Sequence, residues 1–181
     1  MNRKTGEETK MNWIIRPATS DDAQGVINIL NPIIKEAKYT ILDIPFSLEE
    51  EVAFIENFPV NGIFNLAIHP ETQQVVGFQV IEPFATYTHA FDHVGVIGSF
   101  VDSGFMRQGI ASSLFLASFE IAKTMGYEKL FAYVRQDNKR ALATYLKQGF
   151  EQIGLAKKHA KIRGKYIDEV LIEKFLNANK K

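Results

Sequence analysis

Apolar and polar positions follow two periods along the chain, and the changes between them predict its secondary structure. Short runs rich in β-branched and aromatic residues predict strands, whereas apolar residues three or four apart predict helices. The expected strands span residues 13–19, 63–69, 74–83, 93–101, 129–134, 150–160 and 165–175. The expected helices span residues 19–30, 47–58, 110–125 and 136–148. Together they predict a mixed α/β domain with a central sheet.

Several local signals set the expected ends of these elements. Pro32 is expected to kink or interrupt the first helix, because proline has no N–H to donate to the preceding turn. Ser47 and Glu50 have the spacing of a capping box, in which each side chain accepts from the other residue's backbone N–H. Gly149 is expected to end the last helix, with Phe150 packing beyond it.

The composition is that of an ordinary globular protein. Its 181 residues are enough for one domain and short for two. The formal net charge of +0 gives no field to gather nucleic acid or acidic membranes, and the lack of cysteine excludes disulfides and thiolate chemistry. Residues 1–10 are polar, which predicts a flexible leader before a single domain at residues 11–181. No apolar run is long enough to span a bilayer, so a cytoplasmic protein is expected.

The stretch SFVDSGFMRQGIASSLF joins an apolar strand to a long helix through a loop with two glycines. A helix N-terminus offers free N–H groups and the positive end of a dipole, which together bind anions. Gly109 allows close approach of a ligand, Ala111 keeps the next position small, and Arg107 can pair with phosphate oxygens. The loop therefore suits a pyrophosphate. An ordinary strand-to-helix turn would also explain it.

The last predicted helix carries a second candidate pair. Asn138 and Tyr145 are two helical turns apart, so they share one face at about 10 Å along the axis. Ala141 lies between them and leaves a slot along which a thin ligand could run. The alternative is that Asn138 caps the helix and that Tyr145 is a core aromatic.

These two stretches resemble the GNAT superfamily of acetyl-CoA-dependent N-acetyltransferases. The family's loop reads Gln/Arg-x-x-Gly-x-Gly/Ala, and its helix reads Asn-x-x-Ala-x-x-x-Tyr-x-x-x-Gly-Phe. The helix pattern is complete here, from Asn138 to Phe150. The loop pattern matches at Gly109 and Ala111, but Met106 stands where the family usually has Gln or Arg. The opening IIRPAT and the ending AKKHAKIRGKYIDEVLIEKF look like the branch of phosphinothricin and amino-acid acetyltransferases.

The resemblance implies a central mixed, mainly antiparallel sheet, splayed near Val101 so that acetyl-CoA fits between two strands. It also implies direct attack of an amine on the thioester. Tyr145 would protonate the leaving thiolate, and a main-chain N–H near Val101 would stabilise the oxyanion. The implied cofactor-binding residues are Phe100, Val101, Met106, Arg107, Gln108, Gly109, Ile110, Ala111, Ser112, Asn138, Ala141 and Tyr145.

The general base is not given by the resemblance. Members of the branch often have a glutamate on the strand before the loop, where this chain has Val96. Glu82, Asp92 and His93 are the nearby candidates, and each could instead be a solvated or structural polar residue. Acceptor contacts are expected from residues 39–46, from residues 82–91 and from the final hairpin.

The expected acceptor is the primary amine of a small, amino-acid-like molecule. A protein N-terminus or lysine remains an alternative, as does a non-catalytic acyl-CoA-binding module. His89 and His93 would share a face only on a helix, so no metal site is expected. The basic stretch KKHAKIRGK is expected to be a solvated strand edge, so neither nucleic acid nor a membrane is an expected partner. A homodimer is possible.

Overall fold

The structure is a computed structural model that describes residues 12–177. The expected leader, residues 1–10, lies outside the described residues. The strands are β1 (Ile14–Pro17), β2 (Ile63–Ile68), β3 (Val75–Pro83), β4 (Val94–Val101), β5 (Lys129–Arg135), β6 (Glu151–Ile162) and β7 (Lys165–Phe175). The helices are α1 (Ala23–Glu36), α2 (Leu48–Glu56), α3 (Ile110–Thr124) and α4 (Lys139–Lys147), with three short 3₁₀ turns between elements.

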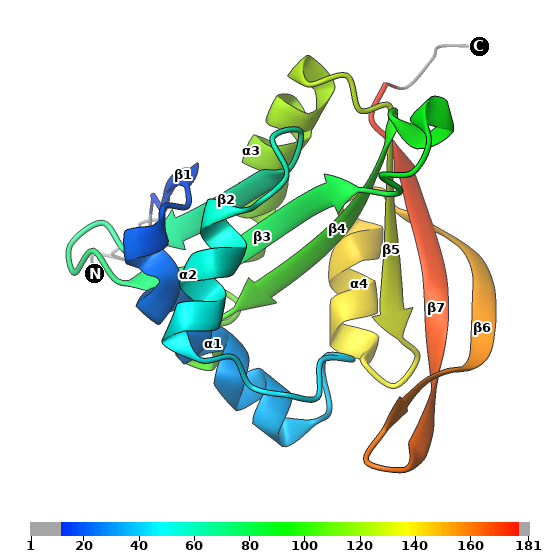
Figure 1. The fold of residues 1–181 in the computed structure, drawn as a ribbon, viewed down its shortest axis with the longest axis horizontal. Coiled ribbons are helices and arrows are strands. Elements are labelled where there is room, and N and C mark those ends of the chain that lie inside the picture. Colours follow the sequence, from blue (N-terminus) through cyan, green and yellow to red (C-terminus); the bar gives the residue numbers. More distant parts are fainter. Residues whose placement is uncertain (1–11, 178–181) are drawn as a thin grey trace, which may run out of the picture.

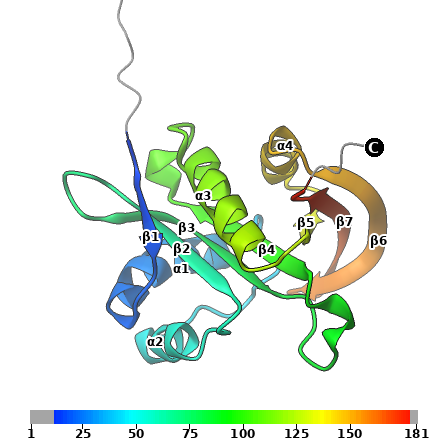
Figure 2. The same ribbon diagram turned by 90° about the horizontal axis from the view of Figure 1, so that it is seen from above.

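The strands form one sheet in the order β1-β2-β3-β4-β5-β7-β6. Every neighbouring pair is antiparallel except β4 and β5, which run parallel. Helices α1 and α2 cover one face, and α3 and α4 cover the other (Figures 1 and 2). The mixed, mainly antiparallel α/β architecture and its element order are therefore confirmed. No helix among the described residues is long and apolar enough to cross a membrane.

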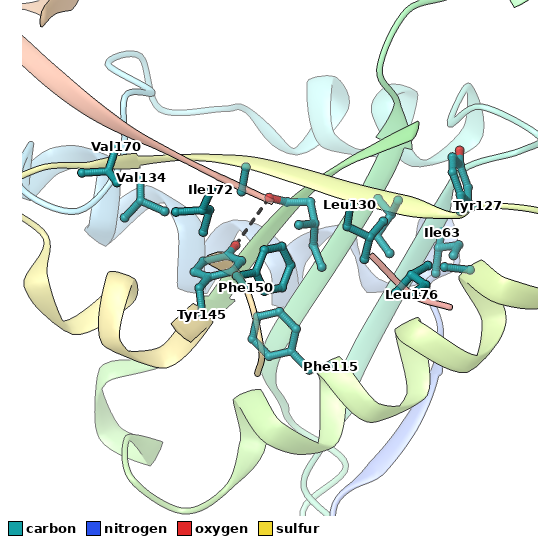
Figure 3. Packing of buried hydrophobic residues seen from close by; sticks show 14 residues of the cluster. Ile63, Phe115, Tyr127, Leu130, Val134, Tyr145, Phe150, Val170, Ile172 and Leu176 are labelled. Carbon is teal, nitrogen blue, oxygen red and sulfur yellow. Dashed lines mark hydrogen bonds between the residues drawn. The ribbon is translucent and has the colours of Figure 1, made fainter. Parts of the chain in front are cut away.

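Side chains alternate between the two faces along each strand, so each face has its own core. On the α1 face, Phe78 of β3 packs with Leu66 of β2 and with Val26 of α1. On the α3 face, Ile97 of β4 and Leu130 of β5 pack with helical residues, including Phe115 and Tyr145 (Figure 3). A residue's position in its strand therefore decides which layer it joins.

The sheet opens between its two parallel strands. Val94, Gly95 and Val96 pair with residues 129–131, and the register ends there. The opening therefore begins at Ile97, earlier in β4 than the expected place near Val101. Beyond this point β4 continues to pair with β3, and β5 pairs along its whole length with β7. Each strand thus follows its antiparallel partner, and the two diverge (Figure 1).

The expected interruption at Pro32 is wrong. Helix α1 runs without a break through Pro32 to Glu36, and it ends where Ala37 takes a left-handed φ of 54°. The side-chain amide of Asn31 donates to the carbonyl of Phe46 at 2.8 Å and accepts from its N–H at 2.9 Å. The proline ring is exposed, so the carbonyl that loses its helical donor lies on the side of the helix that water can reach.

The other local signals are confirmed. Ser47 N–H donates to the Glu50 carboxylate at 2.8 Å, and Glu50 N–H donates to the Ser47 hydroxyl at 3.2 Å, which makes the capping box. Gly149 has a φ of 82°, a conformation that L side chains rarely adopt. Phe150 follows it and is buried against α3.

Candidate functional site

The glycine loop forms the N-terminus of α3 as expected. Gly109 is the N-cap residue, with a φ of 84°, and no heavy atom lies within 4 Å of the place where a Cβ would be. The first helical bond runs from Ser113 N–H to the Gly109 carbonyl at 3.0 Å, so the N–H groups of residues 110–112 point out of the helix end. Trp13 anchors the loop by donating its indole N–H to the Gln108 carbonyl at 2.9 Å.

Two cations stand beside this loop. Arg107 is exposed, with a left-handed φ of 63°. Arg140, on α4, donates to the Met106 sulfur at 2.7 Å and lies 5.0 Å from the centre of the Tyr39 ring. Met106 therefore has a helical arginine as its neighbour. The sequence motifs did not indicate Arg140, because its contact joins α4 to the loop before α3, 34 residues earlier in the chain.

The remaining motif residues of α3 contribute in different ways. Ile110 is 2% exposed and packs in the core, so it can offer a ligand only its backbone. Ala111 and Ala141 are partly buried and pack against the cluster that includes Tyr145. Ser112 is exposed, and its hydroxyl accepts from Gln148 of the α4 end at 3.3 Å.

Asn138 is a helix cap, which was one of its two expected roles. Its side-chain oxygen accepts from Ala141 N–H at 3.1 Å, and its amide donates to the Tyr39 carbonyl at 3.1 Å. The residue is 8% exposed. Asn138 thus ties the start of α4 to the segment after α1, and its side chain is committed within the protein.

Tyr145 brings a hydroxyl to the opening between β4 and β5. The hydroxyl is 3.4 Å from the Ile97 carbonyl, the contact dashed in Figure 3, and 3.4 Å from the Ser99 hydroxyl. The ring packs edge to face on Phe115 and Phe150, with centroids 5.2 and 5.1 Å away. Burial raises the pKa of Tyr145 to about 12, because the phenolate would lose its solvation, and the Ser99 hydrogen bond opposes that rise. The phenol is therefore protonated at neutral pH.

Backbone groups of β4 also face the opening. N–H and C=O groups of successive residues point to opposite sides of a strand. Asp102 N–H donates to Val76 of β3 at 2.9 Å, whereas the Ile97 carbonyl meets Tyr145. The N–H groups of Ser99 and Val101 therefore point away from β3, and the β4–β5 register of the described chain gives them no strand partner. The Phe100 side chain stacks on Phe78, on the α1 face.

Among the three base candidates, Glu82 has the surroundings of a working base. It pairs with Val96 across β3 and β4, so both side chains lie on the α1 face where the sheet begins to open. Burial raises the pKa of the Glu82 carboxyl. Asp92 and His93 are exposed, and Asp92 pairs with His89 at 2.9 Å on the surface.

The first expected acceptor segment is held against the start of α4 and the end of β5. The buried guanidinium of Arg135 donates to the carbonyls of Ala37 at 2.9 Å and Thr40 at 3.2 Å. Asp137 neutralises this guanidinium with two hydrogen bonds of 2.9 and 2.7 Å. The charge of Arg135 is therefore used to fix the loop.

The other two segments approach the same strand. Phe84 contacts Phe131 edge to face at 5.8 Å, and His159 of β6 lies 5.5 Å from Tyr133. Phe131, Tyr133 and Arg135 occupy alternate positions of β5, so their side chains lie on the same face of the strand. The structure thus brings the three expected segments to one face of β5. The basic residues of 157–165 are exposed along β6 and β7, as expected.

Comparison with known proteins identifies this arrangement. The model of the acetyltransferase (GNAT) family matches residues 33–150. Phosphinothricin N-acetyltransferase of Streptomyces coelicolor is 23% identical over 163 residues, which cover 88% of this chain and 94% of that protein. A phosphinothricin acetyltransferase from Sinorhizobium meliloti, crystallised with acetyl-CoA, matches with a TM-score of 0.84 at 18% identity, over 92% of this chain and 90% of that one.

A third relative has a different kind of name. The structure of a ribosomal-protein-alanine N-acetyltransferase from Brucella melitensis matches with a TM-score of 0.82 at 24% identity, over 90% of this chain and 99% of that one. The fold is therefore shared by proteins named for small and for macromolecular acceptors. The chain itself belongs to the acetyltransferase (GNAT) family, as an N-acetyltransferase whose cosubstrate is acetyl-CoA.

Proposed function

We propose that the protein transfers an acetyl group from acetyl-CoA to the primary amine of a small molecule, by direct attack of the amine on the thioester. The observation that carries this proposal is the Tyr145 hydroxyl at the β4–β5 opening, where it can protonate a leaving thiolate. Acetyl-CoA supplies an activated acetyl group, and the residues of the chain bind it, orient it and move protons.

The cosubstrate fits the α3 end of the opening. The outward N–H groups of residues 110–112 and the empty space at Gly109 would accept the pyrophosphate. Arg107 and Arg140 would add positive charge on either side. The Ser99 and Val101 N–H groups point into the opening, where they can donate to amide and thioester carbonyl oxygens and stabilise the oxyanion.

Glu82 would take the proton that the amine loses on attack. Its carboxyl lies on the α1 face, whereas Tyr145 approaches from the α3 face, so base and acid stand on opposite sides of the opening. A raised pKa makes this carboxylate a stronger base than an exposed glutamate. Glu82, on the neighbouring strand, would thus supply the carboxylate that Val96 lacks.

A small acceptor is favoured by contacts at the end of the site. The guanidinium of Arg163, in the β6–β7 turn, donates to the Lys35 carbonyl at the end of α1, at 3.2 Å. Arg135 and Asn138 fix the segment that follows α1. An extended peptide would need an open groove, and these contacts bridge the site at this end.

A protein acceptor is the second candidate, because the Brucella melitensis relative is named for one. The discriminating experiment is a turnover screen with acetyl-CoA against amino acids, polyamines, aminoglycosides and peptides. Turnover of a free amino acid or amine at a kcat/KM well above that of any peptide supports the proposal. Turnover confined to peptides or proteins contradicts it.

The cosubstrate site makes the first prediction. CoA at about one hundred times its Kd should stabilise the fold by about 2.7 kcal/mol and raise Tm, while NAD and ATP do less. Gly109→Asp should abolish the shift, because it adds bulk and negative charge where the pyrophosphate belongs. Gly164→Asp is the matched control, with a φ of 80° and equally open space, and it should keep the shift. Equal shifts in both variants would contradict the assignment.

The position of Glu82 predicts the pH dependence of the rate. The base form grows as pH rises through a pKa above that of an exposed glutamate, so the rate should rise over that higher range. Glu82→Gln should lower kcat and remove this limb of the pH–rate profile. Asp92→Asn and His93→Gln should leave the limb in place. A Glu82→Gln enzyme with the parent profile would show that water or an already neutral amine suffices.

The third prediction concerns the acid. Tyr145→Phe keeps the ring and its packing on Phe115 and Phe150 but removes the proton donor. We expect kcat to fall by on the order of 10²–10⁴, which is about 3–5 kcal/mol of barrier. CoA affinity should change by about 1 kcal/mol or less, because the lost hydrogen bond is neutral. A folded variant, checked by circular dichroism, that keeps the parent kcat while chemistry limits the rate removes Tyr145 from the mechanism.

A further inference from the structure

A row of polar side chains crosses the α3 face of the sheet beneath an otherwise apolar layer. Asn65 of β2 pairs directly with Gln79 of β3, and Gln79 pairs directly with Ser99 of β4. Residues directly opposite each other on neighbouring strands point to the same face. Asn65 is 1% exposed and Gln79 is 0% exposed, so both side chains lie out of reach of water.

The row is hydrogen-bonded to a helix at each end, in two separate parts: Asn65 to α3, and Gln79 with Ser99 to α4. Asn65 donates to the hydroxyl of Ser118, a fully buried residue of α3, at 3.0 Å. Gln79 donates to the Ser99 hydroxyl at 2.7 Å, and that hydroxyl lies 3.4 Å from the Tyr145 oxygen. Among the described residues, the Gln79 side-chain oxygen is the one buried side-chain nitrogen or oxygen without a hydrogen-bond partner.

The donor and acceptor sites of the Ser99 hydroxyl decide which way its hydrogen bonds run. A serine hydroxyl has one proton to donate and two lone pairs to accept with. The Gln79 amide occupies one lone pair at short distance. The proton of Ser99 is then free for its other side-chain contact, the Tyr145 oxygen, whenever the phenol proton points elsewhere.

We propose that Gln79 and Ser99 are positioning residues for Tyr145: the Gln79 amide holds the Ser99 hydroxyl so that it donates to the Tyr145 oxygen when that oxygen gives up its proton. The proposal rests on the proposed function, in which Tyr145 is the acid. Ser99 keeps its own proton throughout. In the step itself, the Tyr145 O–H bond breaks as the S–H bond of CoA forms, and the phenolate is left accepting from Ser99. The proton taken from the amine by Glu82 returns to Tyr145 through solvent after the products leave.

No other side chain described in contact with Tyr145 can do this. The α3 and post-α4 neighbours are the rings of Phe115 and Phe150, and β4 adds the Ile97 carbonyl, which accepts and does not donate. None of these groups is charged, and the raised Tyr145 pKa has no charged cause. In this apolar surrounding a single donated hydrogen bond has a large effect on the phenolate.

The test measures the ionisation of residue 145 directly. A difluorotyrosine at position 145 brings its titration into a range that the fold tolerates, and ¹⁹F NMR follows it in the enzyme without substrate. Ser99→Ala should raise that pKa by about one unit, the value of one net hydrogen bond. In the unlabelled enzyme the same change should lower kcat about tenfold, and Ser99→Thr, which keeps the hydroxyl, should restore most of both.

Ser118→Ala is the matched control, because it removes a buried serine hydroxyl from the far end of the same row. It should shift neither the pKa nor kcat. Gln79→Met should raise the pKa and lower kcat less than Ser99→Ala does, yet leave Tm unchanged or higher, because it also removes the unpaired oxygen. A purely structural Gln79 would instead lose Tm and leave the pKa in place.

Three results would overturn the proposal: no pKa change in Ser99→Ala, an equal change in Ser118→Ala, or a pKa change without any fall in kcat. Because the titration needs no acceptor and no acetyl-CoA, it reports on the Ser99 contact even if the acceptor is wrongly assigned. A failure of the proposed function appears separately, as a Tyr145→Phe enzyme with the parent kcat.

Discussion

The site depends on the end of one strand pairing. β4 and β5 share hydrogen bonds only as far as Val96 and Phe131, after which each follows its antiparallel partner. A strand edge inside a protein is costly, because each buried backbone group without a partner costs about 1–3 kcal/mol. The β4 edge therefore suits an extended ligand that carries amide groups of its own. Tyr145 of helix α4 contacts that edge through the Ile97 carbonyl.

Burial raises the pKa of both groups that we propose to move protons, with a different consequence for each. The pKa of Tyr145 rises to about 12, which keeps the phenol protonated at neutral pH, as the proposed acid requires. The raised pKa of Glu82 makes its carboxylate a better proton acceptor. The sheet separates the two groups, with Glu82 on the α1 face and Tyr145 on the α3 face. The two side chains therefore do not exchange a proton directly.

The sequence predicted the features that depend on residues close together in the chain. The capping box at Ser47, the left-handed Gly149 and the strand periods all depend on a few neighbouring residues, and the structure has them. The Pro32 prediction failed because contacts of α1 with the rest of the fold outweigh one lost helical bond. Asn138 matched its motif, but only the structure shows that its amide is already used by Tyr39.

The parts that could not be predicted depend on register and on contacts between distant elements. The sequence offered Glu82 as one of three base candidates, and only the β3–β4 pairing, which places it beside Val96, separates it from the other two. Arg140 reaches Met106 only because the fold brings α4 close to the loop that precedes α3. Gln79 and Ser118 are polar residues inside apolar stretches, and a hydrophobic pattern treats them as exceptions until their cross-strand partners are known.

Amide hydrogen exchange along β4, with and without acetyl-CoA, tests the central claim that the free edge of this strand holds the cosubstrate. The N–H groups of Gly98 and Phe100 point toward β3, and those of Ser99 and Val101 point into the opening. Slow exchange at Gly98 and Phe100 throughout, with Ser99 and Val101 exchanging fast alone and slowing when acetyl-CoA is added, is the result the account predicts. Slowing that is equal at all four amides, or absent at Ser99 and Val101, would contradict it.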